Sequence, residues 1–183
     1  MLRVKEGDDS AFAELVRNNT HKVHALVYRF LGGSDQAEDV TQEVFLRIYR
    51  TAPKYAPSAK FSTWMYRIVA NLCFNVMRYH QRRPVSHLGA SDERDAFGRD
   101  MPDPAPESPA DPMHREELRD RIAEAVAQLP DNQRLAIILN QYENKGYEEI
   151  SRVLDCSTMA VKSLLSRARE NLRQRLRKDL EIE

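Results

Sequence analysis

The stretch from Tyr147 to Lys178 carries two helical patterns separated by a short polar break, and this feature constrains the fold most strongly. The apolar residues that recur at helical spacing are Ile150, Val153 and Leu154 before the break, and Val161, Leu165, Ala168 and Leu172 after it. Two helices joined by a tight turn can share one small core. The sequence therefore predicts a helix-turn-helix in the last third of the chain.

The second helix of this pair turns small and basic residues away from its apolar stripe. These residues are Met159, Lys162, Ser163, Ser166 and Arg167. Such a face suits the major groove of DNA, where Lys and Arg meet guanine edges and phosphates. A solvated surface helix would show the same pattern, but residues 156–178 hold seven basic side chains against one acidic side chain. This excess favours a polyanionic partner.

Charge is segregated along the chain of 183 residues, although the formal net charge is zero. Residues 84–115 hold six of the nine prolines, with seven acidic and three basic side chains. A segment of this composition buries too little surface to offset the entropy of ordering it, so we expect an extended or disordered linker. Because no strand-like alternation is seen, the sequence predicts an all-α fold. Its parts are two small helical domains, residues 1–83 and 116–183, joined by the acidic, proline-rich linker.

Three helical patterns predict an N-terminal helical bundle in the first domain. The first pattern is a pair of helices, or one helix broken near residues 18–20, and Gly32-Gly33 ends it. The second starts near residue 34 and closes at Pro53, and the third runs from Ser62, expected as its N-cap, to Arg82. In the second helix the residues expected to face inward are Val40, Val44, Phe45 and Ile48.

Residues 60–83 interleave aromatic side chains with basic and amide side chains. Aromatic faces stack on unpaired bases while Arg and Lys hold the backbone, so this composition is typical of single-stranded nucleic-acid binding. A packed helix also needs an apolar residue every three or four positions. Core packing by Trp64, Ile68 and Leu72 is therefore an open alternative to base stacking.

Motifs typical of enzymes, cofactor sites and metal sites are missing from the sequence. His21 and His24 do not group with carboxylates, and Asp39 and Glu43 are the nearest approach to a paired acidic site. We expect no catalytic residue, metal or cofactor, and we expect Cys73 and the cysteine at 156 to be buried thiols. No apolar run is long enough to span a bilayer and the first residues are charged, so we expect a cytoplasmic protein without membrane insertion.

Four motifs together resemble a bacterial RNA polymerase sigma factor of the extracytoplasmic-function (ECF) group. They are DQAEDVTQEVFLRIYR, FSTWMYRIVANL, the acidic linker, and LPDNQR followed by GYEEISRVLDCS and VKSLLSRARENL. The resemblance covers nearly the whole chain apart from the linker. It implies an alternative sigma factor that binds core RNA polymerase and directs promoter-specific transcription initiation and promoter opening.

The resemblance also implies three sets of contact residues. For core polymerase binding they are Asp39, Gln42, Glu43 and Phe45. For recognition and melting of the minus-ten promoter DNA, as duplex and as single strand, they are Lys60, Trp64, Tyr66, Arg67, Asn71 and Asn75. For the minus-thirty-five promoter DNA they are Lys162, Ser163, Ser166, Arg167 and Arg169.

The chain departs from the family pattern on the expected DNA-facing helix. Met159 and Ala160 stand where relatives often have Gly or Glu followed by Thr, and Leu164 replaces a usual Arg. Gly146 stands where Ser or Thr usually caps the first helix of the pair. The promoter sequence therefore cannot be borrowed from relatives.

The family also implies an anti-sigma factor as a partner, with the chain a monomer when free or bound to that antagonist. A rival interpretation is an ordinary helix-turn-helix repressor or activator whose N-terminal domain senses a ligand or dimerises. Such a protein would bind duplex operator DNA tightly by itself, whereas a sigma factor needs the core polymerase. An enzyme such as a metal-dependent hydrolase is the third alternative, and metal-dependent turnover would favour it.

Overall fold

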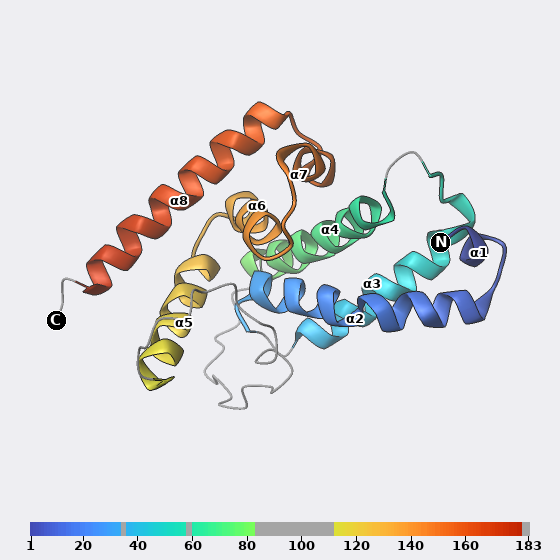
Figure 1. Ribbon diagram of the computed structural model, residues 1–183, viewed down its shortest axis with the longest axis horizontal. Helices are drawn as coiled ribbons and strands as arrows, with labels where there is room; N and C mark the ends of the chain where they lie inside the picture. The colour runs from blue at the N-terminus through green and yellow to red at the C-terminus, as the bar shows by residue number, and fades with distance from the viewer. Residues whose placement is uncertain (34–35, 58–59, 83–111, 181–183) are drawn as a thin grey trace.

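The computed structural model describes residues 1–33, 36–57, 60–82 and 112–180, with side chains from 116 to 177 in the last range. The helices, labelled in Figure 1, are α1 (Leu2–Lys5), α2 (Asp9–Leu31), α3 (Gln36–Thr51), the 3-10 turn η1 (Ala52–Lys54), α4 (Phe61–Arg82), α5 (Pro112–Ala127), α6 (Asp131–Gln141), α7 (Tyr147–Leu154) and α8 (Thr158–Leu180). No strand occurs in these ranges, and the all-α prediction is confirmed.

The first long helix, α2, is continuous, so the prediction of a break near residues 18–20 is wrong. The side chains of Asn19 and Thr20 donate hydrogen bonds to the main-chain oxygens of Leu15 and Val16, each at 2.7 Å. Asn and Thr side chains often disfavour helix interiors because they bond to the backbone in other conformations, but here these bonds form within the helix itself. The polar triplet consequently continues the helix instead of ending it.

Two further helix ends follow local sequence signals, and one helix start does not. Gly32 ends α2 with a φ of 76°, a left-handed conformation that glycine adopts without steric cost, and its N–H donates to the oxygen of Tyr28. Pro53 lies in η1 directly after α3. The helix α4 begins at Phe61, so Ser62 lies inside its first turn and the expected N-cap at Ser62 is wrong.

The N-terminal half, residues 1–82, is a bundle of α2, α3 and α4 with α1 and η1 at one end. Each long helix buries an apolar stripe spaced at three and four residues. The side chains with no exposed surface include Val23, Leu26, Val27 and Phe30 of α2, Val44 and Ile48 of α3, and Val69 and Cys73 of α4. The predicted inward face of α3 is confirmed.

The C-terminal half, residues 112–180, contains the predicted helix-turn-helix as α7 and α8. Its core is formed by Ile150 of α7 and by Val161, Leu165 and Ala168 of α8, all without exposed surface. The helix α6 is buried along residues 134–139 without interruption. A helix buried on every side must be covered on every side, and α6 packs on α7 and α8 of its own half and on α2 of the other.

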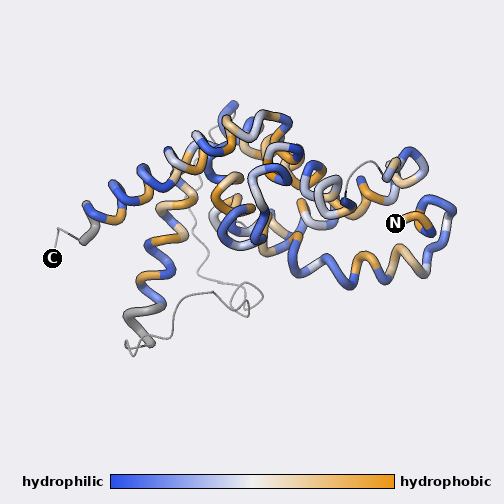
Figure 2. Tube along the Cα trace, turned by 45° about the horizontal axis from the view of Figure 1, so that its top comes forward, coloured by the Kyte–Doolittle hydropathy of each residue, from blue (hydrophilic) through white to orange (hydrophobic). Residues whose placement is uncertain are grey.

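The two halves therefore pack directly on each other, and we call this packing the closed arrangement. The helix α4 lies against α7, and α2 lies against α5 and α6 (Figure 1). One hydrophobic cluster runs through both halves. Apolar residues concentrate where the central helices meet, whereas hydrophilic residues predominate along the free end of α8 (Figure 2).

The segment expected to be a linker lies mostly outside the described residues. Of residues 84–115, the structure describes only 112–115, which form the first turn of α5. The expected domain boundaries at 83 and 116 stay a prediction.

Candidate nucleic-acid interface

The turn between α7 and α8 fixes where the second helix of the pair begins. Asp155 ends α7 with a left-handed φ of 54°. The side chain of Ser157 then accepts a hydrogen bond from the main-chain N–H of Ala160 at 3.1 Å, as an N-cap does. The start of α8 is consequently held in place, and the face of its first two turns is defined.

The predicted minus-thirty-five residues are all exposed on α8. They are Lys162, Ser163, Ser166, Arg167 and Arg169. Arg169 differs from the others because its guanidinium donates to the side-chain oxygen of Asn140 on α6 at 3.1 Å. Within the described residues neither Lys162 nor Arg167 forms an ion pair, so their charges are available to an external anion.

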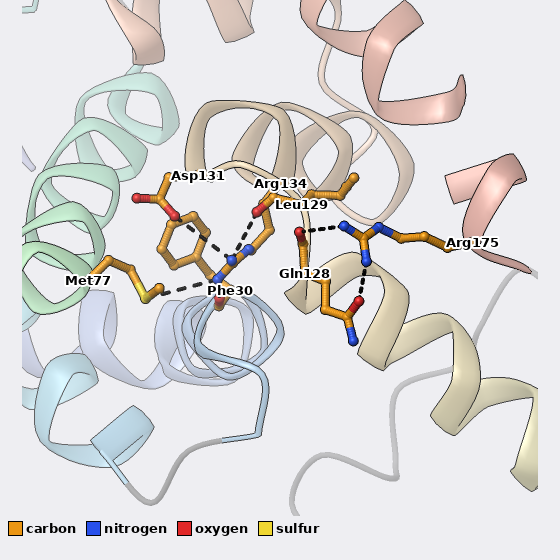
Figure 3. A network of polar contacts seen from close by, with 7 residues as sticks. All are labelled: Phe30, Met77, Gln128, Leu129, Asp131, Arg134 and Arg175. Atoms are coloured by element: carbon orange, nitrogen blue, oxygen red, sulfur yellow. Dashed lines mark hydrogen bonds and ion pairs between the residues drawn. The ribbon is translucent and has the colours of Figure 1, made fainter. Parts of the chain in front are cut away.

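Basic residues farther along α8 hold the helix in place. Arg175 donates from its guanidinium to the side-chain and main-chain oxygens of Gln128 at the end of α5 (Figure 3). Arg173 forms an ion pair with Glu170 at 2.6 Å. The basic side chains of α8 therefore fall into two groups. Arg173 and Arg175 bond within the chain, whereas Lys162 and Arg167, near the start of the helix, form no ion pair among the described residues.

The predicted minus-ten residues on α4 are partly exposed and partly packed. Lys60, Arg67, Asn71 and Asn75 are exposed, whereas Tyr66 is only 3% exposed. Trp64 is half-buried, with its ring centroid 5.1 Å from that of Tyr55 and 6.0 Å from that of Phe61. Trp64 thus packs against aromatic residues of its own half, and the choice between core packing and base stacking stays open.

Tyr66 is buried by the other half of the chain. Its hydroxyl donates to a carboxylate oxygen of Glu143, just after α6, at 2.5 Å, and the ammonium of Lys145 lies 5.4 Å from its ring centroid. Burial, and then the bond to Glu143, raise the pKa of Tyr66, so the phenol remains a donor at any physiological pH. The second oxygen of Glu143 is buried without a hydrogen-bond partner among the described residues.

Two exposed cations of the minus-ten set also meet carboxylates of the C-terminal half. The ammonium of Lys60 lies 3.4 Å from Glu149 on α7, and the guanidinium of Arg67 lies 3.5 Å from Asp155. Burial alone would raise the pKa of Glu149, but Lys145 and Lys60 bring it below its usual value. Three side chains expected to contact DNA therefore contact acidic residues of the same chain.

Arg134 joins the halves at the other side of the interface (Figure 3). Its guanidinium donates to the main-chain oxygens of Phe30 at 2.8 Å and Leu129 at 2.9 Å, and it lies 5.2 Å from the Phe30 ring centroid. Arg134 is 6% exposed, with Asp131 at 3.8 Å as its ion-pair partner. Burial lowers the pKa of Arg134, and the nearby Asp131 opposes this shift. The guanidinium stays charged because the ordinary pKa of an arginine lies far above physiological pH.

The face of α3 expected to bind a protein partner is acidic and polar. Asp39 and Gln42 are exposed, and Glu43 is half-buried at 3.9 Å from both Arg47 and Arg50. Phe45, by contrast, is only 7% exposed. In this arrangement Phe45 supports the face from beneath instead of presenting its ring to a partner.

Two exposed apolar residues of α3 were missed by the sequence reasoning. Leu46 is 48% exposed and Tyr49 is 49% exposed. The Tyr49 hydroxyl donates to Asp9 of α2 at 3.2 Å, and its ring centroid lies 4.9 Å from that of Phe12. Leu46 and Tyr49 follow Phe45 by one and four residues and lie outside the inward-facing stripe of α3. This spacing alone would have predicted that both side chains are exposed.

The described residues hold no clustered metal ligands. No three His, Cys, Asp or Glu side chains come together there as a metal site requires. Cys73 is buried, as expected, and burial raises its pKa to about 12, whereas Cys156 is only half-buried, so the expectation of a buried thiol at 156 is wrong. Among the described helices, none is long and apolar enough to cross a membrane.

Family comparisons match both halves of the chain. Residues 15–83 match Sigma-70 region 2, and residues 119–172 match Sigma-70, region 4. Over 168 residues the chain is 34% identical to the RNA polymerase sigma-H factor of Pseudomonas aeruginosa and 36% identical to the ECF RNA polymerase sigma-E factor of Escherichia coli strain K12. Each alignment covers 92% of this chain and 87% of the relative.

The fold also occurs in solved structures. CnrH, in complex with the cytosolic domain of CnrY, superposes with a TM-score of 0.68 at 23% identity, covering 97% of this chain and 94% of that one. The sigma factor RpoE of Bartonella quintana, in complex with the anti-sigma factor NepR, superposes with a TM-score of 0.66 at 22% identity, covering 91% and 97%.

Proposed function

Since this chain belongs to the sigma-70 family, as one of its ECF factors, we propose how its surfaces divide the work of promoter-specific initiation. The chain is an alternative sigma factor, which binds core RNA polymerase and directs it to promoters. It is a regulatory initiation factor. We propose that it has no catalytic activity of its own and works in the cytoplasm, where polymerase and chromosome meet.

The outer face of α3 is proposed to bind the core polymerase. Asp39, Gln42 and Glu43 supply charge and hydrogen-bonding groups there, and Phe45 holds the face rigid from within. Leu46 and Tyr49 add exposed apolar surface beside them. An apolar centre with a polar rim is the usual composition of a protein–protein interface, so the exposure of these two side chains supports this assignment.

The exposed face of α4 is proposed to recognise and open the minus-ten element. Lys60 and Arg67 would hold phosphates, Asn71 and Asn75 would meet base edges, and Trp64 and Tyr66 would supply aromatic surface for unpaired bases. Both cations and both amides are exposed in this structure. Tyr66 lies beneath the C-terminal half, so its participation needs that half to move.

The start of α8 is proposed to enter the major groove of the minus-thirty-five element. Lys162, Ser163, Ser166 and Arg167 project from the first turns, where a recognition helix reaches base edges. Arg169, bonded to Asn140, is suited to a phosphate at the edge of the groove. The open charges of Lys162 and Arg167 are the single observation that carries this assignment.

The closed arrangement is proposed to be a resting form in which the C-terminal half covers the minus-ten face. Glu143, Glu149 and Asp155 contact Tyr66, Lys60 and Arg67, and these contacts would compete with DNA for the same three side chains. Exposed ion pairs contribute little by themselves. The shared hydrophobic cluster and Arg134 provide most of the packing, and core polymerase would stabilise an open form by binding each half separately.

An anti-sigma factor is proposed as the antagonist of this chain. The two solved structures compared above are both complexes, and one is named as a complex with an anti-sigma factor. We propose that the chain is a monomer both when free and when held by such a partner, since one hydrophobic cluster buries apolar side chains of both halves within the same chain.

Transcription with purified components tests the proposed function. Core polymerase, this chain and sheared genomic DNA of the source bacterium are combined, and the 5′ ends of transcripts are sequenced. We expect discrete start sites that need both proteins. Tight, sequence-specific duplex binding by the chain alone, without core-dependent transcripts, would instead support the repressor or activator interpretation.

A further inference from the structure

Met159 is the most exposed large apolar side chain among the described residues, at 76%. It is the second residue of α8, directly after Thr158. Lys162 and Ser163 follow it three and four residues later, so the three share one face of the helix. This face points away from Val161, which is fully buried.

Exposure alone does not make a residue functional, because single apolar side chains are common on protein surfaces. The position of Met159 adds the second observation. The N-cap at Ser157 fixes the first turn of α8, and first-turn residues of a recognition helix reach base edges.

We propose that Met159 contacts the C5-methyl group of a thymine in the minus-thirty-five element and thereby helps to determine promoter specificity. This inference rests on the proposed placement of α8 in the major groove. Thymine presents the one apolar group on a base edge in that groove, and apolar side chains are its usual partners. The flexible, unbranched methionine side chain can adapt to the position of that methyl group.

The polar side chains beside Met159 do not by themselves select one base pair. Lys162 supplies a charge and Ser163 a hydroxyl, and each can bond to several different bases or to a phosphate. Ala160 has no hydroxyl to offer. A methyl contact by Met159 would therefore give this face a preference for one base pair that its polar residues leave open.

The first test compares promoter selection by the wild type and by Met159→Ala. Purified core polymerase and either protein transcribe a library in which the upstream element of one mapped promoter is randomised. We expect the wild type to enrich thymine at one position and Met159→Ala to lose that enrichment by about fourfold, the effect of burying one methyl group. Met159→Leu should retain the preference, and Arg169→Ala, at the residue assigned to a phosphate, should weaken all sequences alike.

The second test removes the methyl group from the DNA instead. Deoxyuridine replaces the selected thymine, which keeps every base-pairing group and removes only the C5-methyl. Transcription by the wild type should fall about fourfold, whereas Met159→Ala should not respond. An equal response of both proteins, or a uniform loss by Met159→Ala at every upstream sequence, would overturn the inference. Absence of any core-dependent transcript would instead overturn the proposed function.

Discussion

The guanidinium of Arg134 on α6 donates a hydrogen bond to the main-chain oxygen of Phe30 on α2, 2.8 Å away and 104 residues apart in sequence. The same guanidinium bonds the oxygen of Leu129, which ends the turn before α6. One side chain thus fixes the local turn of the C-terminal half and the contact between the halves. The closed arrangement depends on this residue more than on any exposed ion pair.

Replacing Arg134 by Ala should destabilise the folded chain by about 2–4 kcal/mol, because two buried carbonyl oxygens lose a charged donor. Arg134→Lys should recover part of this loss, since an ammonium cannot span both oxygens with the geometry of a guanidinium. Urea unfolding followed by circular dichroism measures the effect. Arg177→Ala, on the exposed end of α8, is the matched control and should change the unfolding free energy by less than about 0.5 kcal/mol. Equal effects of both substitutions would contradict the role given to Arg134.

Gly32 provides a second probe of the contact between halves. A Cβ added at Gly32 would lie 3.1 Å from the Cβ of Ala127 on α5, and the residue has a positive φ of 76°. Gly7 has a φ of 88° with nothing within 4 Å of an added Cβ. Gly7→Ala should therefore show the backbone cost alone, about 1 kcal/mol, whereas Gly32→Ala should cost more. Unfolding curves of the two variants that coincide would mean that α2 and α5 do not press together here.

Glu149 should make the contact between α4 and α7 sensitive to acid. Its pKa is below the ordinary 4.5 in the folded protein, so its carboxylate stabilises the fold above that pH. The contribution is lost as the pH falls from about 4.5 through the lowered pKa. Wild type should thus be more stable than Glu149→Gln at pH 7, and the difference should vanish at strongly acidic pH. A difference that grows on acidification would show that the sign is wrong.

Asp39 and Arg167 should separate the two binding functions. Asp39→Arg reverses charge on the α3 face and should weaken binding to core polymerase without changing which promoters the remaining complex selects. Arg167→Ala should leave core binding intact and reduce use of the upstream element by about tenfold, the usual effect of losing one base or phosphate contact. Fluorescence anisotropy with labelled core and promoter-specific transcription measure the two effects. Unchanged core affinity in Asp39→Arg would remove α3 from the proposed interface.

Local features were predictable from the sequence because their causes are local. The helix-turn-helix follows from apolar spacing, and the end of α2 follows from the glycine pair at 32 and 33. The side chains of Lys162 and Arg167 lie on the exposed face because Val161 and Leu165 face the core. Periodicity alone determines this assignment.

Long-range packing was beyond the same reasoning. Tyr66 looks like an exposed aromatic residue among basic ones, and only contact with Glu143, 77 residues away, shows that it is buried. The stretch at 18–20 looked like a helix break because the bonds from Asn19 and Thr20 to the preceding turn cannot be seen in the composition. Phe45 is expected both inside and at an interface; its ring is buried in this structure, and its place at the polymerase interface stays a prediction.

The distance between the two halves, measured in solution, tests the closed resting form most directly. Ser62 in the first turn of α4 and Arg152 on α7 lie in different halves, on two helices that pack against each other. Both are replaced by cysteine in a Cys156→Ser background and labelled for fluorescence energy transfer, while Cys73 stays protected by burial. We predict one short distance in the free protein and a longer one when core polymerase is added. The same distance in both states, or a long distance in the free protein, would contradict the account.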